Sequence, residues 1–373
     1  MSWQIDPYGH SVAYAKLVHA MGMTAFVGQK INFQTHDNRA KAKALEFHWL
    51  VGGGNASSSS SSTSTSPSSS THEEVERDRI TGNSILGHIL FDNTAGYSYL
   101  LPNVTDDPDH PDYNVESVAD AVATSVAERQ GKYRHSQDVL FLYGSDFAFQ
   151  DAPVPFENME KVMRYVNNRP QRYNFTLQYS TPQRYFSRVR AADAQGGADK
   201  LPTYDGDFFV TSFDPHYVRT GFYSSRNAQK ASDRALWSTT QAAQVVRTFY
   251  QPKFTDDEGQ LATAIGMATA AIGIHQHHDA ITGTDLQNTS DDYIRRMAVA
   301  RAQLSQPAAT AAFVAAGVPV TQAKTATSCL LRNESVCDAT TILSARSTTQ
   351  VDQKNTMGRD DARRNNGVTV AVF

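Results

Sequence analysis

The sequence predicts an α/β domain with a mainly parallel sheet, followed by a three-helix bundle and the start of a β-rich region. In residues 1–204, short apolar runs alternate with stretches of helical length, as in βαβ units. In residues 205–312, three long helical patterns follow one another without strand signals. In residues 313–373, Thr, Val and Ser become frequent from about Val318, which favours short strands.

The elements of the first domain follow from caps and apolar periodicity. Ser11 can cap a helix that Gly22 ends, and Thr181-Pro182 opens another helix with proline at its first position. Further helices are expected over residues 38–50, 115–130 and 156–166. Strands are expected over residues 24–28, 139–143 and 175–179, the second of them buried on both faces. The Ser-rich stretch within about 52–72 cannot bury apolar surface, so we expect a disordered insertion.

The helical module is expected to contain helices over residues 227–246, 261–276 and 291–304. The apolar stretch 261–274 is too short to span a bilayer and indicates a buried helix instead. The formal net charge of −4, from 34 basic and 38 acidic residues, argues against a nucleic-acid partner or a broad anionic-membrane surface.

The cysteines and the N-glycosylation triplets indicate the cellular compartment. Cys329 and Cys337 flank an N-glycosylation triplet at Asn333, which favours a disulfide in an oxidising lumen over two thiols in the cytosol. Further triplets begin at Asn55, Asn103, Asn174 and Asn288.

The N-terminus lacks the basic and apolar regions of a secretory signal, and we expect the chain to begin inside a domain.

Two carboxylates stand where ligands bind in parallel sheets, outside the carboxyl ends of strands. Asp6 precedes a Pro-Tyr-Gly turn, and Asp146 follows the predicted strand 139–143. We expect both to project toward one crevice. The ordinary alternative for either residue is a helix cap or a turn.

The segment His277-His278-Asp279, at the end of an apolar helix, concentrates side chains that suit Zn²⁺. The ordinary alternative is a polar helix terminus with histidines near the negative end of the dipole. His275 is interpreted as a bystander.

Four motifs occur in the order found in class II α-mannosidases, glycoside hydrolase family 38, and the chain most resembles the lysosomal branch of that family. They are Ile5-Asp6-Pro7-Tyr8-Gly9-His10-Ser11, Gly144-Ser145-Asp146-Phe147, Thr220-Gly221-Phe222-Tyr223-Ser224-Ser225-Arg226 and His277-His278-Asp279-Ala280-Ile281-Thr282-Gly283-Thr284. The resemblance covers roughly residues 1–50 and 85–340. Asp205-Gly206-Asp207-Phe208-Phe209 and the cysteine pair also resemble that branch.

The resemblance implies a zinc-dependent retaining exo-α-mannosidase that acts on mannose-containing oligosaccharides or glycoproteins in the lysosomal or secretory lumen. Asp6 would be both zinc ligand and nucleophile, and Asp146 the acid/base. His278 would be a second zinc ligand, and Asp279 would bind sugar hydroxyls. The remaining substrate-site residues implied are Tyr8, Lys30 and His277.

Physical chemistry agrees with this division of roles. A retaining glycosidase needs two carboxyl groups roughly 5–5.5 Å apart, one ionised and one protonated. A carboxylate on a divalent cation stays ionised, whereas one that faces another carboxylate away from the metal can keep its proton. Zinc would orient the vicinal hydroxyls of the sugar.

The chain also departs from the family pattern. The His-x-Asp motif that supplies two further zinc ligands is absent, so we expect zinc to be held weakly. Lys30 stands where an arginine often contacts the site, and Arg219 stands where a tryptophan usually stacks on sugar. The alternatives are a catalytically impaired fragment or pseudogene product that at most binds glycans weakly, or a cytosolic scaffold unrelated to sugars.

Overall fold

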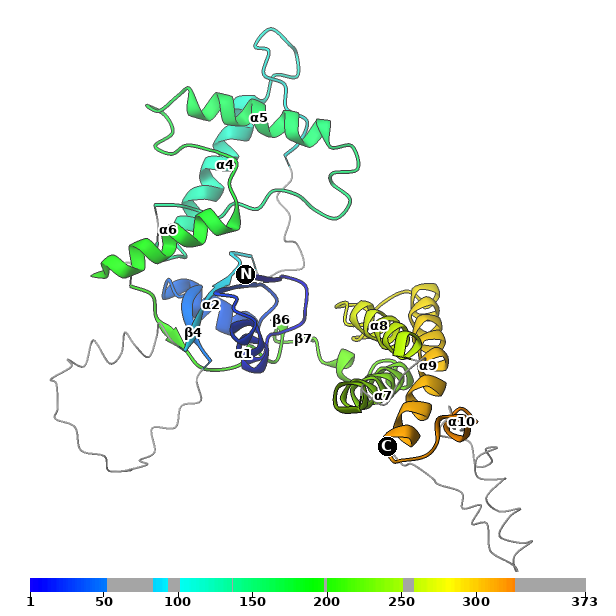
Figure 1. The fold of residues 1–373 in the computed structure, drawn as a ribbon. Coiled ribbons are helices and arrows are strands. Elements are labelled where there is room, and N and C mark those ends of the chain that lie inside the picture. Colours follow the sequence, from blue (N-terminus) through cyan, green and yellow to red (C-terminus); the bar gives the residue numbers. More distant parts are fainter. Residues whose placement is uncertain (52–82, 93–100, 136, 198–199, 251–257, 326–373) are drawn as a thin grey trace, which may run out of the picture. The chain divides into compact units, whose positions relative to one another are not determined.

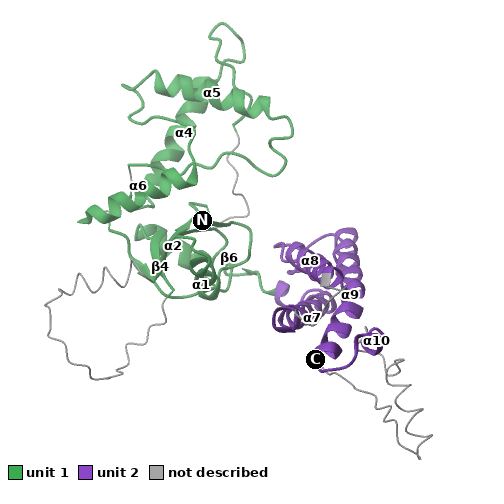
Figure 2. Cartoon of the chain, viewed as in Figure 1, with its two compact units in different colours: residues 1–220 green, residues 221–373 purple. Residues whose placement is uncertain are grey.

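The computed structural model describes residues 1–51, 83–92, 101–135, 137–197, 200–250 and 258–325 (Figure 1). The chain divides into two units, Met1–Thr220 and Gly221–Phe373 (Figure 2). The domain boundaries that the sequence predicts after residues 204 and 312 stay a prediction. The Ser-rich insertion and the Cys329/Cys337 pair lie outside the described residues.

A five-stranded sheet lies at the centre of the first unit, with strand order β1-β2-β4-β3-β5. Its strands are β1 (Ser2–Gln4), β2 (Ala25–Gly28), β3 (Glu46–Leu50), β4 (Ser84–Ile89) and β5 (Thr203–Tyr204). Strand β1 pairs in parallel with β2, β2 with β4, and β3 with β5, while β3 and β4 are antiparallel. The predicted α/β domain is thus found with a mixed sheet that contains parallel strands.

Successive strand residues face opposite sides of the sheet and pack in different cores. Phe26 and Ile85 belong to a cluster with residues of α1 (Val12–Ala20) and α2 (Phe33–Lys41). Val27 and Leu86 belong to another cluster, with Phe186 of α6 (Pro182–Gln195). The sheet is therefore buried on both faces, as its short apolar strands require.

The predicted helix starts in this unit are confirmed at two caps. The hydroxyl of Ser11 accepts a hydrogen bond from the backbone N–H of Ala13 (3.1 Å) at the start of α1. The hydroxyl of Thr181 accepts one from Arg184 (3.3 Å) at the start of α6. Both bonds satisfy N–H groups that the first helical turn leaves unpaired.

Two further helices also stand where the sequence predicts them. They are α4 (Val115–Gln130) and α5 (Pro153–Asn167), and their apolar faces share one cluster that includes Val118, Val122, Val162 and Val166.

The prediction of a helix over residues 38–50 is wrong. Helix α2 ends at Lys41, Lys43 takes a positive φ of 51°, and residues 46–50 form β3. Phe47 and Trp49 are fully buried in the sheet core. Burial of these rings and pairing with two neighbouring strands outweigh the helical pattern of the charged residues before them.

The prediction of strands over residues 139–143 and 175–179 is also wrong, because neither segment forms a strand. Val139 and Phe141 contact the α4–α5 cluster, whereas Leu140 and Leu142 contact the cluster of α6 and the sheet. The first segment therefore satisfies its apolar pattern by packing between two cores. In the second, the side chain of Asn167 bonds both the N–H and the C=O of Leu177 (2.9 Å each).

The second unit consists of helices in the described residues. Helices α7 (Asn227–Tyr250), α8 (Glu258–His275) and α9 (Gln287–Ala315) cover the three predicted ranges, except that α8 ends one residue earlier than expected. All three contact one another and contribute to one core, which includes Leu236, Ile265, Met297 and Leu304. No described helix is both long and apolar enough to cross a bilayer.

Strands expected from Val318 onward are not found in the described residues 318–325, where α10 (Val320–Ala323) forms instead. The rest of the expected β-rich region, from residue 326, lies outside the described residues. A short hairpin of β6 (Ser212–Asp214) and β7 (Tyr217–Val218) precedes the second unit and leads into a 3₁₀ turn at Gly221–Tyr223.

Candidate active site

The turn that carries Asp6 is fixed by contacts from two distant segments. His10 and Phe208 exchange backbone hydrogen bonds (3.2 and 2.8 Å), and the N–H of Gly9 bonds the carbonyl of Lys30 (2.9 Å). Gly9 has φ +95°, and a Cβ there would lie 2.6 Å from the carbonyl oxygen of Phe208. Only glycine fits this close approach without displacing the backbone.

The Asp205–Phe209 motif braces the same turn. The carboxylate of Asp207 accepts a hydrogen bond from the N–H of Val12 (2.6 Å), the first residue of α1. A negative charge is favourable there because the helix N-terminus carries partial positive charge. This motif therefore helps to fix the path of the chain from Asp6 into the helix.

Asp6 and Lys30 meet at the carboxyl ends of two parallel strands. Strands β1 and β2 pair Gln4 with Gly28, so the residues two positions beyond each strand emerge at the same edge. The Lys30 ammonium donates to Asp6 Oδ1 at 2.6 Å, and both side chains are largely buried. Lys30 Nζ also lies 5.1 Å from the ring centroid of Tyr8. The structure thus brings together three of the predicted site residues.

Asp146 does not follow a strand as predicted. It lies exposed in a turn between residues 139–143 and α5. The expectation that it shares a crevice with Asp6 stays a prediction.

In the second unit, His277, His278 and Asp279 form a group that could hold a metal ion. One ligand atom from each residue lies within 4.8 Å of the others. Asp279 Oδ2 is 3.7 Å from His277 Nε2 and 3.8 Å from His278 Nε2. Tetrahedral zinc with bonds of about 2.0–2.1 Å needs ligand atoms roughly 3.3 Å apart. The donor chemistry fits Zn²⁺, whereas the two distances are a few tenths of an ångström longer than zinc ligation requires.

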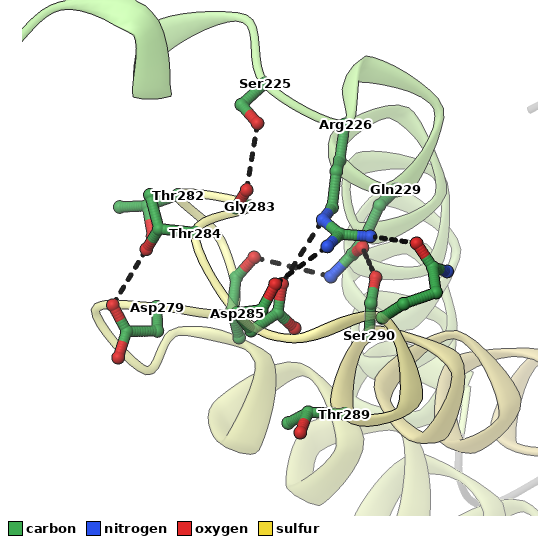
Figure 3. Close-up of polar contacts among 12 residues, drawn as sticks. Ser225, Arg226, Gln229, Asp279, Thr282, Gly283, Thr284, Asp285, Thr289 and Ser290 are labelled. Carbon is green, nitrogen blue, oxygen red and sulfur yellow. Dashed lines mark hydrogen bonds and ion pairs between the residues drawn. The ribbon is translucent and has the colours of Figure 1, made fainter.

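The two residues before α7 and the first turn of α7 hold the loop that carries these residues, and Figure 3 shows the bonds of Ser225 and Arg226. The hydroxyl of Ser225 donates to the carbonyl of Gly283 (2.9 Å) and Arg226 donates to the carbonyl of Asp285 (2.7 Å). Lys230 donates to the carbonyl of Ile281. Two of the sequence motifs, 220–226 and 277–284, are therefore one structural assembly.

A buried polar network lies beneath this loop. His275 Nδ1 is 2.9 Å from Asp233 Oδ1, and His275 Nε2 is 2.8 Å from Gln229 Nε2. Gln229 also accepts from the hydroxyl of Ser290 (2.6 Å) and donates to the carbonyl of Ala280 (3.3 Å). Because all these side chains are buried, each depends on its partners to replace lost water.

Sequence reasoning missed Gln229 and Asp233 and took His275 for a bystander. Polar residues that fall on the buried face of a predicted helix are the signal that could have found them. Asp233 lies three positions before the buried Leu236 on α7 and close to it on the helix surface.

Three of the five predicted N-glycosylation triplets begin in the described residues. Asn103, Asn174 and Asn288 are exposed, whereas Asn55 and Asn333 lie outside the described residues. Asn288 lies in the first turn of α9, close in sequence to the His-His-Asp loop.

The fold and site define an α/β domain with an acidic residue at a strand end, joined to a helical unit that carries a potential metal-binding loop. The family model for the N-terminal domain of glycosyl hydrolases family 38 matches residues 1–207. The model for the alpha mannosidase middle domain matches residues 218–314. The chain belongs to glycosyl hydrolase family 38.

Similar curated proteins carry matching names. The chain is 28% identical to a lysosomal alpha-mannosidase of Dictyostelium discoideum, over 92% of this chain and 32% of that protein. It is 30% identical to an alpha-mannosidase of Arabidopsis thaliana, over 91% of this chain and 31% of that protein. It is 27% identical to the human lysosomal alpha-mannosidase, over 80% of this chain and 27% of that protein. The chain thus spans about a third or less of these relatives.

Proposed function

We propose that this protein is a zinc-dependent retaining exo-α-mannosidase that removes terminal α-linked mannose from N-glycan oligosaccharides or glycoproteins. The observation that carries the proposal is the meeting of Asp6, Tyr8 and Lys30 at the carboxyl ends of β1 and β2, in a chain of glycosyl hydrolase family 38. The proposed location is the lysosomal or secretory lumen, in line with the names of the relatives. The exposed triplets at Asn103, Asn174 and Asn288 would carry glycans, and Cys329 and Cys337 would form a disulfide.

In this proposal Asp6 attacks the anomeric carbon and forms a covalent glycosyl-enzyme intermediate. Asp146 donates a proton to the departing glycosidic oxygen, and then removes a proton from the water that releases mannose. Lys30 holds one oxygen of the Asp6 carboxylate at 2.6 Å, which orients the nucleophile and stabilises its negative charge.

Asp6 and His278 are the proposed zinc ligands. When bound, zinc would bind vicinal hydroxyls of the sugar and polarise them. Asp279 and His277 would contact the same hydroxyls. Thr284 donates to Asp279 Oδ1 at 2.7 Å, which fixes the orientation of that carboxylate.

The roles of the two carboxylates are tested by Asp6→Asn and Asp146→Asn in the full-length protein, with zinc supplied. We expect Asp6→Asn to abolish hydrolysis of α-linked mannobiose. Asp146→Asn should slow it by about 10²–10⁴-fold, the usual contribution of a general acid. An aryl mannoside with a good leaving group needs little protonation, so this variant should hydrolyse it far less impaired.

Asp112→Asn is the matched control, because that side chain is 84% exposed on a different loop. If Asp146→Asn hydrolysed mannobiose at the wild-type rate, the assignment of Asp146 as the acid/base would be wrong. Absence of any mannosidase activity in the wild-type protein would contradict the proposed function as a whole.

A further inference from the structure

Two cationic side chains share the ring of Tyr8. Lys30 Nζ lies 5.1 Å and Arg219 Cζ 5.2 Å from its ring centroid. The Arg219 guanidinium also lies 4.6 Å from the ring centroid of Tyr217 and 5.9 Å from that of Phe213. All five residues belong to the first unit, and the ring of Tyr8 lies within reach of both cations, of which Lys30 bonds Asp6.

The positive charge here exceeds the negative charge that pairs with it. Lys30 pairs with Asp6, whereas Arg219 forms no ion pair with any carboxylate in the part of the chain that the structure describes. Arg219 Nη2 donates to the hydroxyl of Tyr217, and Nε is buried without a hydrogen-bond acceptor. Neither feature neutralises the positive charge of the guanidinium, which therefore remains available to an anion.

Stacking also leaves the guanidinium suited to an anion. A guanidinium that lies over aromatic rings keeps its N–H donors in its own plane, where they match two oxygens of a phosphate. A phosphate monoester carries between one and two negative charges near neutral pH, which suits one arginine with a lysine nearby. A neutral sugar could accept hydrogen bonds here but would leave the positive charge of Arg219 without a counter-charge.

We propose that the sugar site accepts mannosides that carry an anionic substituent, with a phosphate monoester as the best match, and that Arg219 binds this group. The inference rests on the proposed function, because that function makes the surroundings of Tyr8 a mannose site. The inference adds that the site recognises a negative charge on the substrate as well as the sugar ring.

Calorimetric titration of the full chain, with zinc supplied, tests this with mannose, mannose 6-phosphate and inorganic phosphate as probes. We expect mannose 6-phosphate to bind at least about tenfold more tightly than mannose, the effect of one charge-assisted hydrogen bond. Raising the salt from 0.05 to about 0.5 M should reduce this preference, since partly exposed charges are screened.

Three variants assign the effect to Arg219. Arg219→Gln should lose the preference for the phosphorylated sugar while it still binds mannose. Arg219→Lys should keep part of it, because the charge remains but the planar fork is lost. Arg169→Gln is the matched control: Arg169 stacks on Tyr165 at 3.6 Å in another part of the unit, and its loss should leave the preference intact. Circular dichroism verifies that each variant is folded.

The outcomes separate this inference from the proposed function. Equal affinity for mannose and mannose 6-phosphate would overturn the inference and leave the mannosidase proposal standing. Failure of both sugars to bind would overturn both. Inorganic phosphate that binds as tightly as mannose 6-phosphate would also overturn the inference, because the sugar would then contribute nothing.

Discussion

At the scale of single residues, His10 shows how burial sets the protonation of the turn that carries Asp6. Its ring is buried against Phe26, with ring centroids 5.0 Å apart, and a Cβ at Gly28 would lie 2.7 Å from its Nε2. This burial lowers the pKa of His10 from 6.5 to about 3, because an apolar environment disfavours the charged imidazolium. The folded turn therefore contains a neutral histidine.

This pKa predicts acid sensitivity of the first unit. Between pH 6.5 and about 3 the unfolded chain binds a proton at His10 that the folded chain does not, so stability falls as the pH decreases through this window. The decrease should approach about 1.4 kcal/mol per pH unit. Above pH 6.5 His10 contributes no pH dependence.

Urea unfolding of wild type and His10→Gln between pH 4 and 8 measures this effect. The variant should lose stability less steeply below pH 6.5. His110→Gln, at a half-exposed histidine in another loop, should retain the wild-type slope. Parallel curves for wild type and His10→Gln would show that His10 remains protonatable in the folded state.

At the scale of elements, the N-terminal turns of α7 act on the loop after α8 through hydrogen bonds to its backbone. Asp233 holds His275, the last residue of α8, and Gln229 reaches the carbonyl of Ala280 within the loop. Metal-binding residues depend on such supporting contacts for their orientation. The backbone on both sides of His278 is thus held by residues on a different helix.

Asp233→Ala should destabilise the second unit by about 1–3 kcal/mol, because His275 Nδ1 would remain buried without its partner. Amide hydrogen exchange of residues 276–284 should also become faster, as the loop loses an anchor. Gln241→Ala, at an exposed position of α7, is the control and should change neither. Unchanged exchange in a destabilised Asp233→Ala variant would restrict Asp233 to a structural role in the core.

At the scale of the whole molecule, the proposed zinc ligands would make the stabilities of the two units depend on one another. Asp6 belongs to the first unit and His278 to the second. A metal that binds only the folded protein, through a ligand from each, stabilises both by mass action.

We therefore expect zinc to raise the unfolding temperature of both units in calorimetry. The stabilisation is about 2.7 kcal/mol when free zinc is 100 times the dissociation constant. Asp6→Asn and His278→Ala should each remove it, and His277→Ala, the neighbouring imidazole, should largely retain it. A shift confined to the second unit would mean that zinc binds the His277–Asp279 group without Asp6.

The sequence alone predicted the parts of this protein that local chemistry specifies. Ser11 and Thr181 mark helix starts because capping needs only neighbouring residues. The motif around Asp6, together with the order of the four motifs along the chain, is sufficient to indicate the family.

Contacts between distant residues could not be read in the same way. Residues 46–50 became a strand, and 139–143 remained outside the sheet, because partners far along the chain supply or withhold the pairing. The same holds for the bond from Lys30 to Asp6, the stacking of Arg219 on Tyr8, and the pairing of His275 with Asp233. Local signals identify which side chains a site contains, whereas the fold decides which of them touch, because that choice depends on burial and on distances that no sequence pattern specifies.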